Sequence, residues 1–295
     1  MAFRPGFILF VVPILLSSLT ANSSSVRPPF RAIVGPVLIA ERGGYREAPE
    51  NTLASVRHSI AAQADWIHVD VTLSRDDKVV VIHDSTLERT TNGTGSVSKK
   101  RLRELQKLSA GSPELSQDTL AVLKKSKIKP LGFNEKYPKE KIPSLKQVLN
   151  AGDIRVMVEL RPGAHPRRLA HGVIDLLNRA SAWDRVAVAS VDTELLSLAH
   201  NRDPTVALIG IAASREALEN HLESPVSAVV ISESLLAQAW EIIPPGVAIW
   251  IRTVRDLETA SRLMNRGVHG MITDIPKKVV KHLRPQVDVH LKLSR

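Results

Sequence analysis

Short, almost wholly apolar runs alternate with amphipathic stretches along most of this chain, and that alternation restricts the fold more than any other feature. Apolar runs without regular polar interruptions are typical of parallel strands that are buried on both faces. Helix start signals separate the runs: Asn51-Thr52 precedes Leu53, Val56 and Ile60, which are spaced three and four residues apart. The expected strands are Val37–Ala40, Trp66–Val71, Val79–His83, Ile154–Glu159, Val186–Ala189, Val206–Ile211, Ala228–Ile231, Ala248–Ile251 and Gly270–Thr273.

About eight strand–helix units favour a closed barrel over an open doubly wound sheet, so we predict an α/β fold of the TIM-like (β/α)8 type. The strand candidates exceed that number by one. Because the connection Ser74–Lys78 is short and polar, Trp66–Val71 and Val79–His83 can form a hairpin rather than two full βα units. Such a barrel takes about 250 residues, and we assign it to 35–285 of the 295 residues.

The stretch 96–141 does not follow the strand–helix rhythm. It is rich in Lys, Ser, Leu and Pro, and it includes the basic run Lys124–Pro130. We interpret it as a small insertion after the third strand that folds over the barrel top. It could serve as a substrate lid or a membrane-facing patch, or it could be a solvated helical excursion.

Residues 1–25 are expected to be a signal peptide or an N-terminal anchor. Arg4 precedes the apolar stretch Phe7–Leu19, and small and polar residues follow at Thr20–Ser25. The apolar stretch is shorter than the roughly 20 residues of a transmembrane helix. We therefore expect an exported protein, periplasmic or secreted, with an uncleaved membrane anchor as the alternative. The chain contains no cysteine, which agrees with a core large enough to need no disulfide bonds.

The formal net charge of +10 favours anionic partners such as phosphate esters, anionic lipids or nucleic acids, although it could also be a solvated basic surface. Only 4% of the residues are aromatic, and single-stranded nucleic acids are commonly bound by stacking on aromatic rings. Together with the expected export, this scarcity leads us to expect no nucleic-acid partner.

Ionisable residues close four of the expected strands. They are Glu41 and Arg42, His68 and Asp70, His83 and Asp84, and Glu159. In a closed α/β barrel, polar residues at the carboxyl ends of strands form the active site. A buried charge without a partner costs several kcal/mol, so these groups must pair with one another or bind a ligand. One histidine at a strand end is often structural, but four such ends favour a functional site.

The residue types suit a metal-assisted reaction on a phosphodiester. Asp70 and Glu159 offer hard oxygen ligands for a divalent cation, and His68 could add an imidazole nitrogen. The planar fork of Arg42 is suited to gripping a phosphate, and His83 could act as a general acid or base. The sequence has neither a Gly-x-Ser-x-Gly elbow nor a thiol, which disfavours a serine or cysteine nucleophile.

The segment Ile39–Gly95 resembles the signature of the glycerophosphodiester phosphodiesterase family. The family's motifs correspond here to Ala48-Pro49-Glu50-Asn51-Thr52, His83-Asp84, Arg89-Thr90-Thr91-Asn92-Gly93, Ile142-Pro143-Ser144-Leu145, Glu159-Leu160-Arg161, Trp250–Val254 and Gly267–Asp274. Two positions carry each other's residue: the family's first histidine is Glu41, and the glutamate of its Glu-x-Asp strand is His68.

The resemblance implies a barrel of the PLC-like phosphodiesterase type. It also implies metal-dependent hydrolysis of glycerophosphodiesters to glycerol 3-phosphate and an alcohol, a hydrolase of lipid metabolism. The expected partner is a small-molecule phosphodiester or a lysophospholipid, with peripheral membrane contact as a further option. The expected cofactor is a divalent metal ion, Mg or Ca first, and Mn or Zn if His68 is a ligand.

The resemblance also implies roles for individual residues. The implied catalytic residues are His83, Glu41, Arg42 and His68. The implied metal ligands are Asp70, Glu159, His68 and Glu41. Arg42, Arg161 and Trp250 are the implied substrate-binding residues, and Glu50 and Asp84 are implied to be structural neighbours of the site. Arg161 takes the place of a family lysine.

Glu41 and His68 lie at the ends of strands expected to be neighbours, about 4.8 Å apart. Three hypotheses follow for this exchange. The two residues could trade roles, with Glu41 binding metal and His68 acting as acid or base. The site could keep its metal and act on a different or slower substrate. Alternatively, the protein could be a catalytically inactive module that binds a phosphodiester or lipid headgroup.

Overall fold

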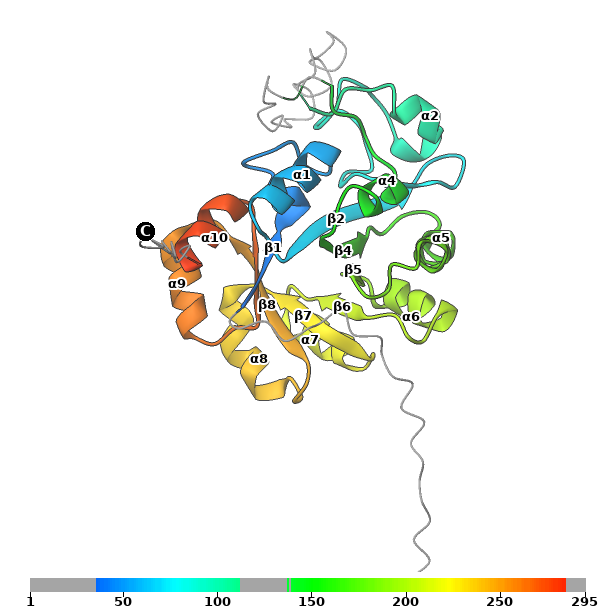
Figure 1. Cartoon of the computed structure of the whole chain (residues 1–295). Helices are drawn as coiled ribbons and strands as arrows, with labels where there is room; N and C mark the ends of the chain where they lie inside the picture. Colours follow the sequence, from blue (N-terminus) through cyan, green and yellow to red (C-terminus); the bar gives the residue numbers. More distant parts are fainter. Residues whose placement is uncertain (1–35, 112–136, 138, 285–295) are drawn as a thin grey trace, which may run out of the picture.

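Eight parallel strands close into a barrel in the part of the chain that the computed structural model describes, which is residues 36–111, 137 and 139–284 (Figure 1). The strand order is β1-β9-β8-β7-β6-β5-β4-β2, and β1 pairs with β2 to complete the ring. The strands are β1 (Val37–Ala40), β2 (Trp66–Leu73), β3 (Val79–Val81), β4 (Arg155–Leu160), β5 (Val186–Ser190), β6 (Leu208–Ile211), β7 (Val226–Ile231), β8 (Ala248–Val254) and β9 (Gly270–Thr273). The predicted TIM-like (β/α)8 fold is confirmed.

The ninth strand, β3, lies outside the barrel. It pairs antiparallel with the distal half of β2, with Val71 opposite Val81 and Leu73 opposite Val79. The predicted hairpin is therefore confirmed, and it accounts for the surplus strand candidate. The hairpin extends β2 beyond the barrel rim, and β3 runs back toward the barrel, so that Ile82, just after β3, donates its N–H to the carbonyl oxygen of Asp70.

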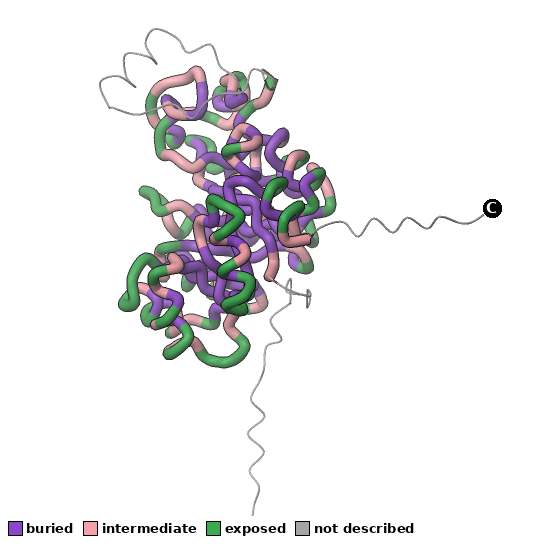
Figure 2. The backbone as a smooth tube through the Cα atoms, turned by 90° about the vertical axis from the view of Figure 1, so that its left-hand side faces the viewer, coloured by how far each residue is buried: buried purple, intermediate pink, exposed green. Residues whose placement is uncertain are grey.

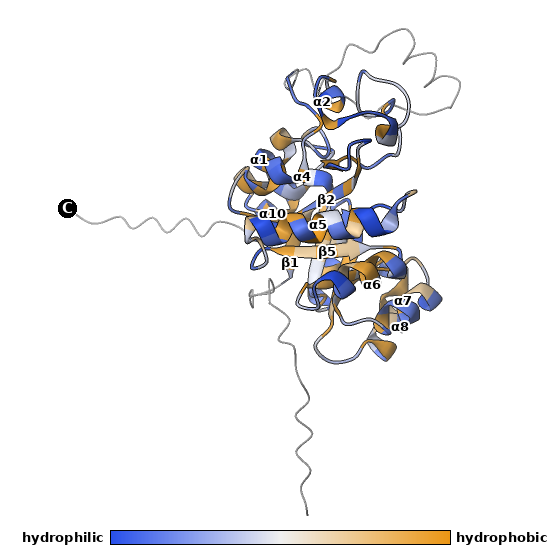
Figure 3. Cartoon of the chain, turned by 90° about the vertical axis from the view of Figure 1, so that its right-hand side faces the viewer, coloured by the Kyte–Doolittle hydropathy of each residue, from blue (hydrophilic) through white to orange (hydrophobic). Residues whose placement is uncertain are grey.

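Helices cover the barrel from outside (Figures 1 and 3). They are α1 (Leu53–Ala61), α2 (Leu102–Leu105), α4 (Leu145–Leu149), α5 (Pro166–Ala180), α6 (Thr193–Arg202), α7 (Arg215–Leu222), α8 (Leu236–Ile242), α9 (Leu257–Asn265) and α10 (Pro276–Leu283), with short 3-10 turns η1 (Glu41–Gly43), η2 (Val97–Lys99) and η3 (Glu233–Leu235). Side-chain caps begin several of them. The Thr52 hydroxyl accepts the Ser55 N–H at the start of α1, and the Asp192 carboxylate accepts the Glu194 N–H at the start of α6.

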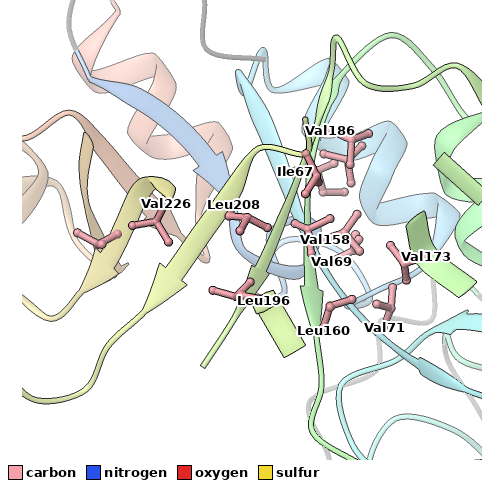
Figure 4. Packing of buried hydrophobic residues seen from close by; sticks show 14 of the residues in the cluster. Ile67, Val69, Val71, Val158, Leu160, Val173, Val186, Leu196, Leu208 and Val226 are labelled. Atoms are coloured by element: carbon pink, nitrogen blue, oxygen red, sulfur yellow. The ribbon is translucent and has the colours of Figure 1, made fainter. Parts of the chain in front are cut away.

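Alternate residues of each strand enter two separate cores. Outward-facing residues such as Ile67, Val69 and Val158 pack against helices, for example against Val173 of α5 (Figure 4). The inward-facing cluster comprises Ile39, Trp66, Met157, Ala187, Ala189, Ala207, Ile209, Ile211, Ala228, Val230, Trp250 and Ile272. Figure 2 shows buried backbone through the centre of the molecule and exposed backbone at its periphery. The barrel interior is thus a packed core, as this fold requires.

The described part of the predicted insertion, residues 96–111, 137 and 139–141, contains η2 and α2. Its apolar side chains join those of β3 in a small separate core that includes Val80, Ile82, Val97 and Leu105. Residues 112–136 and 138, with the basic run Lys124–Pro130, lie outside the described residues, as does the predicted signal segment 1–25. Within the described ranges, no helix has the length and apolar character needed to span a bilayer.

Candidate active site

The inward faces of the strands change from apolar to charged at the carboxyl end of the barrel. On β2, His68 and Asp70 follow the buried Trp66 at intervals of two residues, so all three point inward. On β4, Glu159 follows the inward-facing Met157 in the same way, and Arg161 directly follows the strand. The apolar layers therefore support a charged layer at the end of the barrel where this fold places its active sites.

His68, Asp70 and Glu159 form the one group of potential metal ligands found among the described residues. One ligand atom from each lies within 4.8 Å of the other two, and all three side chains are buried. An ion with bonds of about 2.0–2.6 Å would place opposite ligands about 4–5 Å apart, so the spacing fits a single cation. Asp70 Oδ1 is buried without a hydrogen-bond partner, which leaves this oxygen available to an ion.

Asp70 is held in place by Asn51. The Asn51 Nδ2 donates to Asp70 Oδ2 at 2.9 Å, and the Asp70 N–H donates to Asn51 Oδ1 at 3.2 Å. Asn51 has a φ of 57° just before α1, a conformation that asparagine tolerates better than most residues. The pair of bonds orients the carboxylate and leaves Oδ1 as its free oxygen.

Glu159 is fully buried, and its carboxylate is surrounded by nitrogen donors from two arginines and a histidine. Arg161 Nη1 lies 2.6 Å from Oε1, while His68 Nε2 and Arg252 Nη1 each lie 3.0 Å from Oε2. Burial alone would raise the pKa of Glu159, but the hydrogen bond and charge of His68 and the charges of Arg252 and Arg161 outweigh it and hold the pKa well below its usual value. Glu159 is therefore ionised at neutral pH.

The hydrogen bonds of His68 assign its tautomer. The Arg42 N–H donates to His68 Nδ1 at 3.3 Å, which places the proton of the neutral ring on Nε2, facing Glu159. His68 Nε2 also lies 4.0 Å from Asp70 Oδ1. Nε2 is therefore the ring nitrogen that faces both carboxylates and that an ion held by them would meet.

Arg42 lies beside the acidic cluster on a strained turn. Its φ is 49°, and the following Gly43 has φ 81° and lies so close to Ser55 of α1 that a Cβ would be 2.3 Å from the Ser55 side chain. Arg42 Nη1 donates to Glu50 Oε1 at 3.2 Å, and its Nε lies 3.4 Å from Asp70 Oδ2. Burial lowers the pKa of Arg42, but the carboxylates around the guanidinium raise this pKa by more. The net result is a pKa above the ordinary value. The guanidinium is permanently charged.

Glu41 lies next to this cluster but outside the group of three potential ligands. Its Oε1 is 3.7 Å from Arg252 Nε, and its Oε2 is buried without a hydrogen-bond partner. Arg252 thus lies between Glu41 and Glu159. Among the exchanged residues, it is His68 that the structure places with Asp70 and Glu159.

His83 is oriented by a chain of charged hydrogen bonds. Its Nδ1 lies 2.6 Å from Asp84 Oδ1, and Asp84 accepts from Arg89 at 2.6 and 3.0 Å. Arg89 also donates two bonds of 2.8 Å to Glu50, which in turn accepts from Arg42. One continuous network therefore connects His83 to Arg42.

Burial and pairing act in opposite directions on the charges of this network. For Asp84, burial raises the pKa, but hydrogen bonds from His83 and Arg89 lower it more, to well below the usual range. For Arg89, burial lowers the pKa, and the bonds to Glu50 and Asp84 raise it far above its ordinary value. Both groups are held in their charged forms.

A polar cavity of about 380 Å³ opens beside this network. Its lining includes His83, Asp84 and Arg161, together with Thr72 and Ser85. His83 presents its ring to this cavity while Asp84 engages Nδ1, which leaves Nε2 for a ligand. Arg161 lines the cavity and also touches Glu159, so the cavity adjoins the acidic cluster.

Most of the residues expected from the sequence are brought together, and one is not. The cluster and its surroundings contain Glu41, Arg42, Glu50, His68, Asp70, His83, Asp84, Glu159 and Arg161. Trp250, expected to bind substrate, lies instead in the barrel core. It is 1% exposed, and its ring meets Trp66 edge-on with centroids 5.6 Å apart.

Sequence reasoning assigned no site role to Asn51, Arg89 or Arg252. Arg252 follows Trp250 at an interval of two and so belongs to the same inward face. That spacing could have identified it. The sequence places Asn51 in a helix start and in a family motif, and Arg89 in another motif. It assigns neither a site role, because their roles depend on contacts with residues of other elements.

Comparisons with known proteins agree with this geometry. The sequence profile of the glycerophosphoryl diester phosphodiesterase family matches residues 42–278. A glycerophosphodiester phosphodiesterase of Caldanaerobacter subterraneus subsp. tengcongensis is 30% identical over 262 residues, which are 84% of this chain and 98% of that protein. One of Bacillus subtilis is 26% identical over 297 residues, covering 90% of this chain and 95% of the relative.

Solved structures show the same fold. A phosphodiesterase of Oleispira antarctica, determined in complex with the product sn-glycerol-3-phosphate, superimposes with a TM-score of 0.72 at 26% identity and covers 84% of this chain and 97% of its own. A glycerophosphodiester phosphodiesterase of Agrobacterium tumefaciens superimposes with a TM-score of 0.63 at 22% identity, covering 83% and 98% respectively.

Proposed function

The chain belongs to the glycerophosphoryl diester phosphodiesterase family, and on that premise we propose that it hydrolyses glycerophosphodiesters to glycerol 3-phosphate and an alcohol with the help of a divalent metal ion. The observation that carries the proposal is the joint placement of three elements at one barrel end. These are the buried His68–Asp70–Glu159 group, the guanidinium of Arg42 beside it, and His83 on the adjoining cavity.

The acidic group would hold the cation through Asp70, Glu159 and His68. A divalent ion bound there supplies positive charge that polarises the phosphoryl group. The two carboxylates suit Mg²⁺ or Ca²⁺, whereas an imidazole ligand favours Mn²⁺ or Zn²⁺. Because His68 replaces an oxygen ligand of the family pattern, we propose that Mn²⁺ or Zn²⁺ activates this protein better than Ca²⁺ does.

Two arginines would bind and orient the phosphodiester. Arg42 Nε lies 3.4 Å from Asp70 Oδ2, and Arg161 Nη1 lies 3.9 Å from Asp70 Oδ1. A guanidinium presents paired donors that match two phosphoryl oxygens. The network through Glu50 fixes the direction of the Arg42 fork, so that little side-chain freedom is lost when a substrate binds.

His83 would move the proton. Asp84 binds Nδ1 and thereby leaves Nε2 to donate a proton to the departing alkoxide oxygen or to accept one from water. The carboxylate of Asp84 stays ionised and so continues to hold Nδ1. The arrangement resembles other acid–base histidines whose second nitrogen is held by a carboxylate.

The proposal is tested with purified, metal-stripped protein on a panel of glycerophosphodiesters and lysophospholipids. Mg²⁺, Ca²⁺, Mn²⁺ and Zn²⁺ are added back separately, and release of glycerol 3-phosphate is measured. We expect turnover that needs metal and falls by about 10²–10⁴-fold in His83→Ala. His282→Ala, on the outer surface of α10, is the matched control and should retain activity. Binding of glycerophosphodiesters without turnover under every metal would favour the inactive binding module.

The Glu41–His68 exchange has its own test. Calorimetric titration with Mn²⁺ and Mg²⁺ compares the protein with Glu41→His, His68→Glu and the double variant. If His68 is a ligand, His68→Glu alone shifts preference toward Mg²⁺ and Glu41→His leaves metal affinity nearly unchanged. Lost affinity in Glu41→His would instead support the role trade, with Glu41 as the ligand.

A further inference from the structure

Two cavities lie near Glu159. Each is lined by an arginine whose guanidinium also binds the Glu159 carboxylate. Arg161, on Oε1, lines the polar cavity that contains His83. Arg252, 3.0 Å from Oε2, lines a second cavity of about 320 Å³ at the carboxyl ends of β5, β6 and β7. Two separate cavities are therefore within reach of the arginines that bind Glu159.

The second cavity is apolar. Its lining includes Val191, Ile211, Ala213, Val230 and Ser232, with Arg252 as the charged member. Ile211 and Val230 continue the inward-facing rows of the barrel core, whereas Ala212, Ala217 and Ile231 belong to the outer core, so the cavity lies at the rim where the two cores meet. Val191 is 46% exposed. An exposed valine at the rim of such a cavity is apolar surface available to a ligand.

The two ester arms of the substrate differ in the same way as the two cavities. The glycerol arm carries two free hydroxyls, and the polar cavity offers hydroxyl, imidazole and guanidinium groups from residues such as Thr72 and Ser85. The other arm is the alcohol that leaves, and its nature defines the substrate. We propose that the apolar cavity binds this alcohol and selects an uncharged hydrocarbon group, a short alkyl or aryl chain. The inference rests on the proposed hydrolase function.

The charge of the leaving alcohol distinguishes esters of uncharged hydrocarbon alcohols from choline or ethanolamine esters. A quaternary ammonium group is usually bound by carboxylates or by a cage of aromatic rings. The described lining residues of the apolar cavity include neither, and Arg252 would repel a cation. A hydrocarbon chain, in contrast, gains from leaving water for this surface, and the volume is at the lower end of ligand cavities.

The test compares kcat/KM for glycerophosphodiesters of hexanol, methanol and choline at saturating metal. We expect the hexyl ester to exceed the choline ester by at least about 10-fold, since a few methylenes in an apolar pocket give such ratios. Ala213→Phe, which fills the cavity, should lower the hexyl-to-methyl ratio by at least about 10-fold. Ala237→Phe, on the exposed surface of α8, is the matched control and should keep the ratio of the unmodified protein.

A second variant and a binding assay keep the test decisive. Ser232→Asp introduces a carboxylate at the cavity and should move preference toward the choline ester. Non-hydrolysable phosphonate analogues with hexyl or choline arms are titrated into the metal-loaded protein and measured by calorimetry. Equal affinity for both analogues, with no response to Ser232→Asp, overturns the apolar-cavity inference whether or not turnover occurs. Absence of turnover for every diester, with selective binding of the hexyl analogue, overturns the hydrolase function alone.

Discussion

Individual side chains at this barrel end depend on one another for their charge. Glu159 is ionised because the guanidinium groups of Arg161 and Arg252 and the ring of His68 surround it, and those groups are held in place because Glu159 is ionised. Removing one partner from such a cluster leaves the others buried without compensation, which costs more than the lost bond itself. The site is therefore a single electrostatic unit and not a set of independent residues.

Arg89 is the residue that joins the two halves of this unit. Its guanidinium makes four hydrogen bonds, two to Asp84 and two to Glu50. Lysine keeps the charge but cannot reproduce the fork. We predict that Arg89→Lys lowers kcat by about 10–10²-fold, because small displacements of a catalytic group are costly. Arg168→Lys, which alters only an exposed pair with Asp77, is the control for steady-state kinetics.

Asp84 should make stability depend on pH. Its folded-state pKa lies below the value of about 3.9 expected in the unfolded chain. The unfolded state therefore binds the proton first, so the contribution to stability is complete above about pH 4 and disappears as the pH falls through the folded-state pKa. We predict that the stability gap between the unmodified protein and Asp84→Asn narrows as the pH falls below about pH 4. Denaturant unfolding measures it, and a gap unchanged at pH 3 would contradict the prediction.

Packing between elements relies on a few close contacts, and the contact of β6 with α7 is one of them. His221 of α7 is buried, and its Nε2 lies 3.1 Å from the carbonyl oxygen of Ile211. A Cβ at Gly210 of β6 would lie 2.6 Å from the imidazole. Glycine is thus required at this position because a buried ring occupies the space that a side chain would need.

Gly210→Ala should therefore destabilise the protein through steric overlap. We expect a loss of about 1–3 kcal/mol in the free energy of unfolding, the usual cost of overpacking a core. His221→Ala alone should also be destabilising, because it leaves a cavity. The double variant should lose less than the sum of the two single losses, since the small residue makes room for the new methyl group. Additive losses in urea denaturation would show that the overlap is relieved elsewhere.

The whole barrel closes at its shortest ladder. β1 and β2 share only the pairs Ile39–Trp66 and Ala40–Ile67. Asp65, just before β2, reinforces this seam: its Oδ2 accepts the Leu38 N–H at 2.7 Å. Arg284, after α10, binds both Asp65 oxygens at 2.9 and 2.7 Å. The end of the described chain thus helps to close the ring at its beginning.

Asp65→Ala should lower the melting temperature of the entire domain. It removes the ion pair and leaves the Leu38 N–H without its acceptor, a loss of about 1–3 kcal/mol. At about 2–4 °C per kcal/mol for a domain of this size, we expect a decrease of several degrees. Asp175→Ala, which removes a more exposed ion pair with Arg202, is the calorimetric control and should change the melting temperature little.

Export remains a proposal at the level of the whole molecule, because residues 1–25 lie outside the described residues. We propose that this segment directs the chain across a membrane, on the basis of its positive residue and short apolar stretch. A reporter enzyme that is active only after export, fused behind residue 30, should be active when fused to this segment. It should lose that activity when charged residues interrupt the apolar stretch.

Much of the fold could be predicted because periodicity is a local property. Val37–Ala40 and Gly270–Thr273 begin and end as expected, and most other strands differ by a few residues. Strand ends carrying ionisable groups likewise located the site. Trp250 was expected to bind substrate but lies in the barrel core. The sequence shows which face of the strand a residue takes, but it does not show how far along the barrel axis that residue lies.

By itself, the sequence determined the barrel, its β2–β3 hairpin and the set of charged residues at its carboxyl end, because apolar alternation and strand-end polarity are encoded within single elements. Only the tertiary structure decided which charges meet. His68 joins Asp70 and Glu159 while Glu41 faces Arg252, and Arg252 separates the two. These pairings connect strands that are far apart in the chain, and their distances follow from the way the ring closes. The apolar cavity at β5–β7 has the same origin, since it exists only where three strand ends meet.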